Sequence, residues 1–328
     1  MSVSAHPFHI LTPEFIMDAV ESQGIVCDCR ILALNSYENR VYQVGVEDDV
    51  PVIAKFYRPH RWSDAQIREE HDFCRDLADH ELSVVAPRRN ADNESLFHFH
   101  GFRFALYPRQ GGHAPEFDNL DNLLLLGRML GRIHCIGGVQ PFARRPLLDS
   151  ASFGHASAAL LLEHWVPREY RESYAAVTAQ LLEAVDRIQA EVGPVRLIRT
   201  HGDCHAGNIL WRDNVPHFVD FDDARMAPAV QDIWMMLSGD RHRQTEQLQA
   251  IMEGYVEFNE FDPRELALVE VLRTLRMLHY SAWVASRWDD PAFPLAFPWF
   301  NTIQYWGEQI LQLREQLAAL NEPPLELD

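Results

Sequence analysis

Strand-like and helix-like segments occupy different parts of this chain, which limits the folds available to it. Five short segments within the first 108 residues have the composition of strands, and an amphipathic segment that starts near Ser63 predicts a helix among them. After the turn-rich residues 107–112, the apolar spacing is mostly helical. The order predicts an α+β protein with a small, mostly antiparallel N-terminal domain, 1–108, and a larger, mainly helical domain, 109–328. The strands are expected at 30–34, 40–46, 51–57, 95–100 and 102–106, and helices at 123–136, 157–165, 173–192, 230–237, 245–258, 263–286 and 302–320, besides one that opens at Pro13.

The chain is strongly acidic, and this limits its partners. Its 48 acidic and 29 basic residues give a formal net charge of −19, a field that repels nucleic acid and anionic membranes. No stretch reaches the ~20 apolar residues that a membrane span needs, and the first residues lack the order of a signal peptide. We therefore expect a cytoplasmic monomer without nucleic-acid or membrane partners. An anionic ligand would depend on local positive groups or on a metal ion.

Lys55 is the only lysine among the 29 lysine and arginine residues, and it lies in the apolar run Pro51–Tyr57. A guanidinium is a broad planar fork, whereas an ammonium is a compact charge that suits a phosphate in a narrow cleft. Val-Ile-Ala-Lys is also written like the strand lysine of a kinase, which pairs with nucleotide phosphates and a helix glutamate. The alternative interpretation is that Lys55 has no special function and is a lysine retained by chance in a chain whose other basic residues are arginine.

The segment from His201 to Asn208 has the most chemical information. It has the form H-x-D-x-x-x-x-N, which is how a kinase catalytic loop is written. Phosphoryl transfer needs a carboxylate that accepts the proton of the attacking hydroxyl, a role that Asp203 fits, and oxygen ligands for Mg²⁺. Asn208 and Asp220 offer neutral and charged oxygens of the kind that Mg²⁺ prefers. Two short strands around an Arg212-Asp213-Asn214 turn would return Asp220 to the side of Asn208.

Two other interpretations of this segment remain open at this point. One is a solvated acidic loop, in which Asp and Asn serve only as turn residues. The other is the metal centre of a hydrolase, with His201, Asp203 and His205 joined by Asp220 or Asp222 as ligands. The first leaves the apolar flanks of the loop unexplained, and the second gives no role to Asn208 or Lys55.

Several segments together resemble a known family. His201-Gly202-Asp203 with Asn208, followed by Val219-Asp220-Phe221-Asp222, is similar to the aminoglycoside phosphotransferase-like branch of the protein kinase fold, which includes choline and homoserine kinases. The runs 34–42, 55–59, 203–211, 288–294 and 322–325 resemble the bacterial stress response kinases over essentially the whole chain. The resemblance implies a bilobal kinase-like fold and an autophosphorylating serine/threonine protein kinase that uses Mg²⁺ and ATP and acts in envelope stress and cell survival.

The resemblance also implies roles for individual residues. Asp203 would accept the proton, and Asn208 and Asp220 would hold magnesium. Lys55 would bind the ATP phosphates with Glu70 as its helix partner, Glu69 being a second candidate for that ion pair. Ser36 lies in the loop that would cover the phosphates, although residues 35–40 lack the glycines of the usual phosphate loop. A phosphoaspartate on Asp220 is a further possibility, but we expect direct in-line transfer because a metal-bound carboxylate is a poor nucleophile. Asp232 is expected to brace the catalytic loop through backbone hydrogen bonds.

The sequence leaves the acceptor open. A protein with a serine or threonine acceptor is expected, and a small-molecule alcohol kinase of the choline, homoserine or aminoglycoside type is the alternative. Aromatic residues are dense between Tyr280 and Trp306, where a cage could hold a cationic acceptor. Helix packing is the interpretation we favour for these aromatic side chains.

Overall fold

The computed structural model describes residues 6–327, and its contacts divide the chain into two compact units. The first unit contains the chain up to Glu116 together with 142–145 and 205–224, and the second contains 117–141, 146–204 and the chain from Arg225 onward. The first unit thus runs beyond the boundary expected after residue 108, and it takes in two later segments of the chain. The predicted α+β class is confirmed, since a five-stranded antiparallel sheet lies in the first unit and most of the helices lie in the second.

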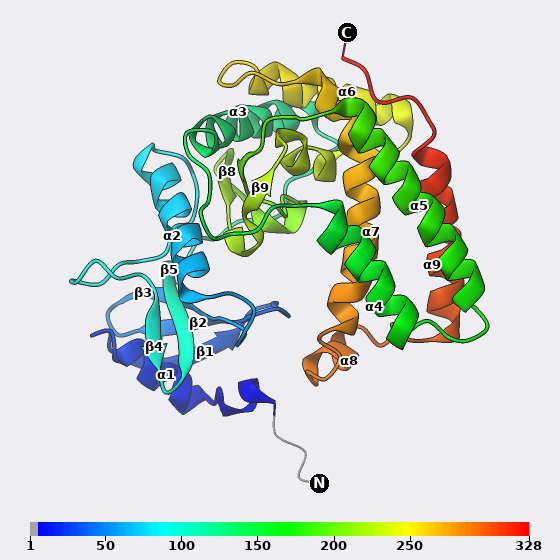
Figure 1. The fold of residues 1–328 in the computed structure, drawn as a ribbon. Coiled ribbons are helices and arrows are strands. Elements are labelled where there is room, and N and C mark those ends of the chain that lie inside the picture. Colours follow the sequence, from blue (N-terminus) through cyan, green and yellow to red (C-terminus); the bar gives the residue numbers. More distant parts are fainter. Residues whose placement is uncertain (1–5, 328) are drawn as a thin grey trace. The chain divides into compact units, whose positions relative to one another are not determined.

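The sheet of the first unit has the strand order β1-β2-β3-β5-β4 (Figure 1). All neighbours are antiparallel, and Lys55 of β3 is paired with Val41 of β2 and Ala105 of β5. Lys55 is therefore on the central strand, where both neighbours restrain its backbone. The elements of the sheet and its two helices are α1 (Pro13–Glu21), β1 (Cys27–Ala33), β2 (Arg40–Val46), β3 (Asp49–Phe56), α2 (Asp64–Asp79), β4 (Phe97–Phe99) and β5 (Phe102–Pro108).

Strand alternation decides which way Lys55 points. Successive side chains of a strand face opposite sides of the sheet, and Val52, Ala54 and Phe56 enter a hydrophobic core that includes residues of α1. Lys55 therefore faces the other side, as does Tyr57, which packs with Ile67 of α2. Helix α2 begins as predicted, with a capping box between Ser63 and Gln66.

The predicted hairpin is present in the first unit. β7 (Ile209–Arg212) pairs antiparallel with β8 (Val215–Phe218), and the turn residues Asp213 and Asn214 both have positive φ, which is typical of a type I′ turn. The backbone N–H of Val219 donates to the carbonyl oxygen of Asn208 at 3.0 Å. Asn208 and Val219, the residue before Asp220, are therefore neighbours at the base of the hairpin.

The second unit is built mainly from helices, of which α4, α5, α7 and α9 share one hydrophobic core (Figure 1). Glycines allow α3 and α6 to approach closely, because a Cβ on Gly127 would lie 1.9 Å from the carbonyl oxygen of Ile251. The elements are α3 (Leu120–Gly137), α4 (Ser157–His164), α5 (Arg171–Val192), β6 (Ile198–Thr200), β9 (Arg225–Ala227), α6 (Arg241–Tyr255), α7 (Val269–Ala285), α8 (Ala292–Ala296) and α9 (Ile303–Ala319).

Two stretches of the second unit differ from the expected helices. Residues 230–237 form two 3₁₀ turns, Ala229–Asp232 and Trp234–Met236, instead of the expected α-helix. The prediction was wrong because buried apolar side chains can have a helix-like spacing in tight turns as well. Residues 263–268 are likewise 3₁₀, and α7 starts only at Val269. The short antiparallel pair of β6 and β9 was not predicted, since each strand has only three residues.

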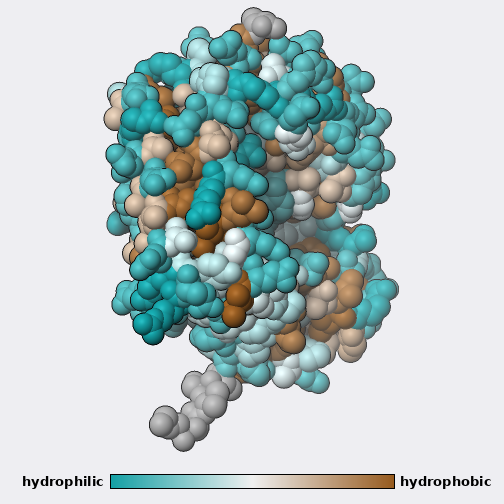
Figure 2. All heavy atoms as spheres, turned by 90° about the vertical axis from the view of Figure 1, so that its right-hand side faces the viewer, coloured by the Kyte–Doolittle hydropathy of each residue, from teal (hydrophilic) through white to brown (hydrophobic). Residues whose placement is uncertain are grey.

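The C-terminal aromatic residues mostly pack against one another. Phe293, Phe300 and Trp306 are at most 2% exposed, whereas Tyr280 and Trp299 are about two-fifths exposed. The packing interpretation therefore accounts for the buried members of this group. Figure 2 shows hydrophobic patches among hydrophilic side chains on one face of the molecule. Within residues 6–327, none of the helices combines the length and apolar character needed to cross a membrane.

A buried histidine in α2 gives a pH-dependent prediction. His71 is 1% exposed and lies between the hydroxyl of Tyr57, at 2.7 Å, and the hydroxyl of Ser95, at 2.9 Å. Burial, helped by the positive charges of Lys55 and Arg145, lowers the pKa of His71 from its ordinary 6.5 to about 3. Between these values the unfolded chain binds the extra proton, so the stability from neutral His71 is present above pH 6.5 and is lost as pH falls toward 3.

We expect the free energy of unfolding of the wild type to fall by ~2 kcal/mol more than that of His71→Gln between about pH 7.5 and pH 5, at ~1.4 kcal/mol per pH unit. Denaturant titration of both proteins at the two pH values measures this difference. Other titrating groups cancel in the comparison. Equal losses in the two proteins would show that His71 is not the group responsible.

Candidate active site

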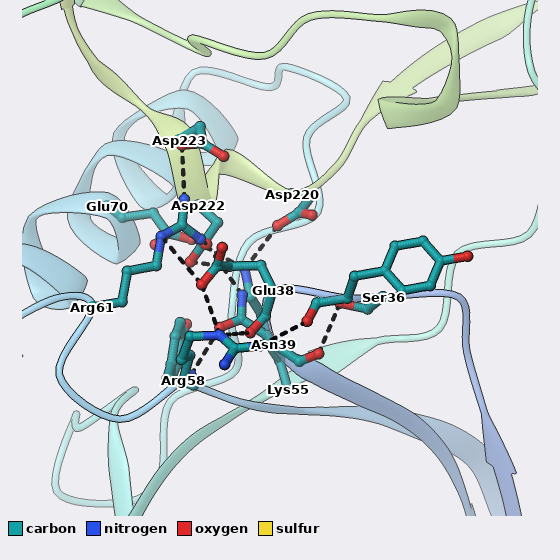
Figure 3. Close-up of polar contacts among 12 residues, drawn as sticks. Ser36, Glu38, Asn39, Lys55, Arg58, Arg61, Glu70, Asp220, Asp222 and Asp223 are labelled. Atoms are coloured by element: carbon teal, nitrogen blue, oxygen red, sulfur yellow. Dashed lines mark hydrogen bonds and ion pairs between the residues drawn. The ribbon is translucent and has the colours of Figure 1, made fainter. Parts of the chain in front are cut away.

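Lys55 is the centre of a buried group of charges in the first unit (Figure 3). Its ammonium nitrogen lies 2.8 Å from Asp220 Oδ1, 3.3 Å from Asp222 Oδ1 and 3.9 Å from Glu70 Oε1. Burial would lower the pKa of Lys55, but these carboxylates outweigh it and raise that pKa well above its ordinary value. Lys55 is therefore a permanent cation at the end of the central strand.

Asp222 organises this group of charges, a role that the sequence did not indicate. It is 3% exposed, accepts a hydrogen bond from Asn39 at 3.1 Å and is paired with Arg61 (Figure 3). Burial alone would raise the pKa of Asp222, yet the charges of Arg61 and Lys55 hold it below its ordinary value. Asn39 and Arg61 are distant from Asp222 in sequence, so no local signal could have revealed that they contact it.

The two neighbouring glutamates of α2 have different surroundings. Glu70 is 1% exposed and reaches both Lys55 and, at 3.5 Å, Arg145. Burial raises the pKa of Glu70 from 4.5 to about 7, against the pull of Lys55. Glu69 instead accepts hydrogen bonds from the backbone N–H groups of 143–145. Of the two candidates for the lysine partner, the structure brings only Glu70 to Lys55.

Ser36 lies in the loop between β1 and β2. Its hydroxyl donates to the carbonyl oxygen of Asn39 at 3.2 Å (Figure 3). The side-chain oxygen of Asn39 accepts the backbone N–H of Arg58 at 3.0 Å, so Asn39 ties this loop both to the chain after β3 and to Asp222. Hydrogen bonds from polar side chains hold the loop, which has no glycine.

Asn208 and Asp220 fit the requirements of a magnesium site. The hairpin brings their backbone positions together, and the side chain of Asp220 is 51% exposed, so its carboxylate is accessible. Asp220 has φ 59° and ψ 63°, a left-handed conformation that is uncommon for a residue other than glycine and that often marks functional sites. Because Mg²⁺ usually takes only one or two protein carboxylates and fills its octahedron with water and phosphate oxygens, this pair offers enough protein ligands.

Asp203 belongs to the second unit, whose boundary falls between Cys204 and His205, whereas Asn208 and Asp220 belong to the first. Within the second unit, Asp203 pairs with Arg276 of α7 at 2.5 Å between Oδ1 and Nη1. The backbone N–H of Asp203 donates to Nδ1 of His201 at 3.3 Å. His201 is itself fully buried, so it fixes the backbone that presents Asp203.

Asp232 braces the start of this loop, as predicted. Its carboxylate accepts the backbone N–H groups of His201, at 2.7 Å, and Gly202, at 2.8 Å, and it contacts His134 at 3.0 Å. Burial would raise the pKa of Asp232, but its hydrogen bonds, above all the one with His134, outweigh burial and lower that pKa. Asp232 is thus an ionised, fully buried anchor of the loop.

Replacing Asp232 with asparagine keeps the size of the side chain and removes its charge. We expect a loss of ~2 kcal/mol in the free energy of unfolding, because hydrogen bonds to a charged group contribute about 1.5–3 kcal/mol. Denaturant titration measures this change, with Asp213→Asn in the exposed hairpin turn as the control for the same substitution. An unfolding free energy equal to that of the wild type would reject the bracing role.

The interpretation as a hydrolase metal centre gains no support from the structure. Within the described part of the chain, no three histidine, cysteine, aspartate or glutamate side chains form a group that could hold a metal ion. Asp222 is engaged by Lys55, Asn39 and Arg61, and His205 Nδ1 accepts the backbone N–H of Gly207 at 3.0 Å.

The sequence of this chain matches the model of the phosphotransferase enzyme family over residues 30–269. It is 44% identical over 329 residues to the serine/threonine protein kinase RdoA of Salmonella typhimurium, and 44% identical over 328 residues to stress response kinase A of Escherichia coli. Each alignment covers 100% of this chain and 99% of the relative. The chain belongs to the phosphotransferase enzyme family and is a full-length relative of the stress response kinases. It is an ATP-dependent kinase.

Solved structures show the same fold. The amicoumacin kinase hAmiN in complex with AMP-PNP, Ca²⁺ and Ami has a TM-score of 0.69 and 20% identity, covering 90% of this chain and 89% of that one. A microcompartment-associated aminopropanol kinase has a TM-score of 0.70 and 17% identity, covering 92% and 94%. The predicted kinase-like fold is confirmed. The complex of hAmiN agrees with the use of a nucleotide and a divalent metal ion in this fold.

Proposed function

We propose that this chain is a Mg²⁺- and ATP-dependent serine/threonine protein kinase that phosphorylates itself and a protein partner. The observation that supports this most directly is the buried Lys55 ammonium 2.8 Å from Asp220, a carboxylate at the base of the hairpin that begins next to Asn208. A phosphate and a divalent metal ion are the ligands that such a combination of groups suits. The names of the relatives at 44% identity favour a protein acceptor and a role in a stress response. That the stress concerns the cell envelope, and that the kinase serves cell survival, is part of the proposal and rests on the resemblance to the bacterial stress response kinases.

The proposed residues have distinct roles. Lys55 would pair with the nucleotide phosphates, with Glu70 holding the ammonium from α2, and the loop of Ser36 would cover the phosphates. Asn208 and Asp220 would hold Mg²⁺, which when bound neutralises charge that develops on the transferred group. Asp220 acts as a metal ligand in this proposal, and the phosphoryl group passes directly to the acceptor.

Asp203 would orient the acceptor hydroxyl and take its proton as the new oxygen–phosphorus bond forms. The γ-phosphoryl group leaves ATP, and ADP keeps the electron pair of the broken bond, so atoms and charge balance without a covalent enzyme intermediate. The bracing of this loop by Asp232 serves positioning, because phosphoryl transfer depends mainly on alignment and electrostatics.

A phosphotransfer assay with γ-labelled ATP and Mg²⁺ tests the acceptor. The purified chain is incubated alone, with generic proteins, and with choline, homoserine or an aminosugar, and labelled sites are mapped. Label on serine or threonine of the chain or of an added protein supports the proposal. Consumption of ATP only when a small alcohol is present would reject the protein acceptor and establish the small-molecule alternative.

A further inference from the structure

The guanidinium of Arg276 lies beside the carboxylate to which we assign proton acceptance. Arg276 is on α7, and its Nη1 is 2.5 Å from Asp203 Oδ1, with the two side chains 39% and 21% exposed. Ion pairs between partly exposed side chains contribute little to stability. The main consequence of this pair is therefore that it holds the positive charge of Arg276 beside the carboxylate of Asp203.

Arg276 differs from the arginine one turn earlier on the same helix. Arg273 packs over the ring of Trp234, at 5.3 Å, and pairs with Glu270 at 3.1 Å. Arg276 instead pairs with Asp203, and a guanidinium has five N–H donors in a fixed fork. An interaction with one carboxylate oxygen leaves donors for a second anion, and 39% exposure makes them accessible.

The guanidinium of Arg276 would lie close to the hydroxyl of the acceptor. A proton-accepting carboxylate must approach the acceptor hydroxyl to within ~2.6–3.2 Å, and Arg276 is 2.5 Å from that carboxylate. Arg276 contacts Oδ1, which is buried, so the reacting hydroxyl would meet Oδ2 and lie within about 8 Å of the guanidinium. This is no farther than the Debye length of ~8 Å at physiological ionic strength. At such a distance the charge next to the hydroxyl affects binding.

We propose that Arg276 determines acceptor specificity: it favours a serine or threonine flanked by acidic residues and disfavours acceptors with a cationic group near the hydroxyl. This inference rests on the proposed function, in which Asp203 receives the hydroxyl proton. The chain as a whole has a net charge of −19 and repels acidic segments, so an acidic acceptor needs a local positive group of this kind. An amino alcohol would instead place its ammonium beside a like charge.

Two peptides that differ only in the residues around one serine, aspartates in one and lysines in the other, serve as probes. The specificity constant kcat/KM for each is measured by transfer of label from γ-labelled ATP. The wild type is expected to prefer the acidic peptide. Arg276→Glu is expected to change the ratio of the two constants toward the lysine peptide by about tenfold or more, since like charges in contact cost more than 1.4 kcal/mol and each 1.4 kcal/mol is tenfold. The ratio for Arg276→Gln should lie between the ratio of the wild type and that of Arg276→Glu.

The matched control is Arg187→Glu, the same charge change on an arginine of α5 that is 50% exposed and paired with Glu191. It is expected to keep the wild-type ratio. A purely structural effect of Arg276 would lower both constants equally, so the ratio separates the two roles. A wild type that prefers the lysine peptide, or an unchanged ratio in Arg276→Glu, would overturn the inference while leaving the kinase intact. Transfer to neither peptide nor to the chain itself would refute the proposed protein kinase activity, and the inference with it.

Discussion

Replacing Asp203 with asparagine is expected to lower kcat by about 10²–10⁴-fold, the usual contribution of a positioned general base. Asparagine has nearly the same size, but it cannot accept the proton of the acceptor hydroxyl. Because the proposed role of Asp203 belongs to the transition state, kcat and kcat/KM should fall together. The affinity for the nucleotide should stay within a few-fold of the wild type, since Lys55, Asn208 and Asp220 are unchanged. Steady-state kinetics and calorimetric titration with ATP and Mg²⁺ measure the two quantities.

The control for this experiment is Asp213→Asn, the same chemical change at an 86% exposed position of the hairpin turn. Asparagine tolerates the positive φ of Asp213, so this variant should behave like the wild type. A turnover of Asp203→Asn within threefold of the wild type would contradict the assignment of Asp203.

Replacing Lys55 with methionine should affect both stability and nucleotide binding. The ammonium is buried among the carboxylates of Asp220, Asp222 and Glu70, and methionine keeps the length of the side chain without its charge. Removal of one partner from a buried ion pair costs about 3–5 kcal/mol, and we expect a loss near 3 kcal/mol because Arg61 and Arg145 remain. The nucleotide should bind about 10- to 100-fold more weakly, as the loss of a charge-assisted hydrogen bond predicts.

The double variant Lys55→Met with Glu70→Gln separates the two effects. Neutralising Glu70 removes a buried carboxylate that has lost a cation, so the double variant should unfold at a higher denaturant concentration than Lys55→Met alone. Its nucleotide affinity should remain low, because the phosphate partner is still missing. A Lys55→Met protein as stable as the wild type, or with unchanged nucleotide affinity, would contradict the role assigned to Lys55.

Local signals in the sequence were sufficient for much of the first unit. The apolar run 51–57 predicted the strand that carries Lys55, and the amphipathic segment that starts near Ser63 predicted α2. The turn at 213–214 determined the hairpin that returns the chain from Asn208 to Asp220. Each of these features depends on residues that are close together along the chain, which is why a pattern could predict them.

The remaining parts of the candidate site depend on contacts between distant segments. Asp222 is held by Asn39 and Arg61, and Asp203 is paired with Arg276. Long-range ion pairs leave no periodic trace in a sequence, and an arginine has no local feature that identifies its partner. The 3₁₀ turns at 229–236 were missed for a different reason, since their buried residues also have a spacing that suits an α-helix.

A crystal structure of the chain with Mg²⁺ and a non-hydrolysable ATP analogue would test the central claim most directly. The account predicts that the ammonium of Lys55 lies within hydrogen-bond distance of the phosphates. It also predicts that the metal ion binds the side-chain oxygen of Asn208 and the carboxylate of Asp220, which exchanges its contact with Lys55 for the metal. A nucleotide bound elsewhere, with Lys55 still paired to Asp220 and no metal on Asn208, would contradict the account.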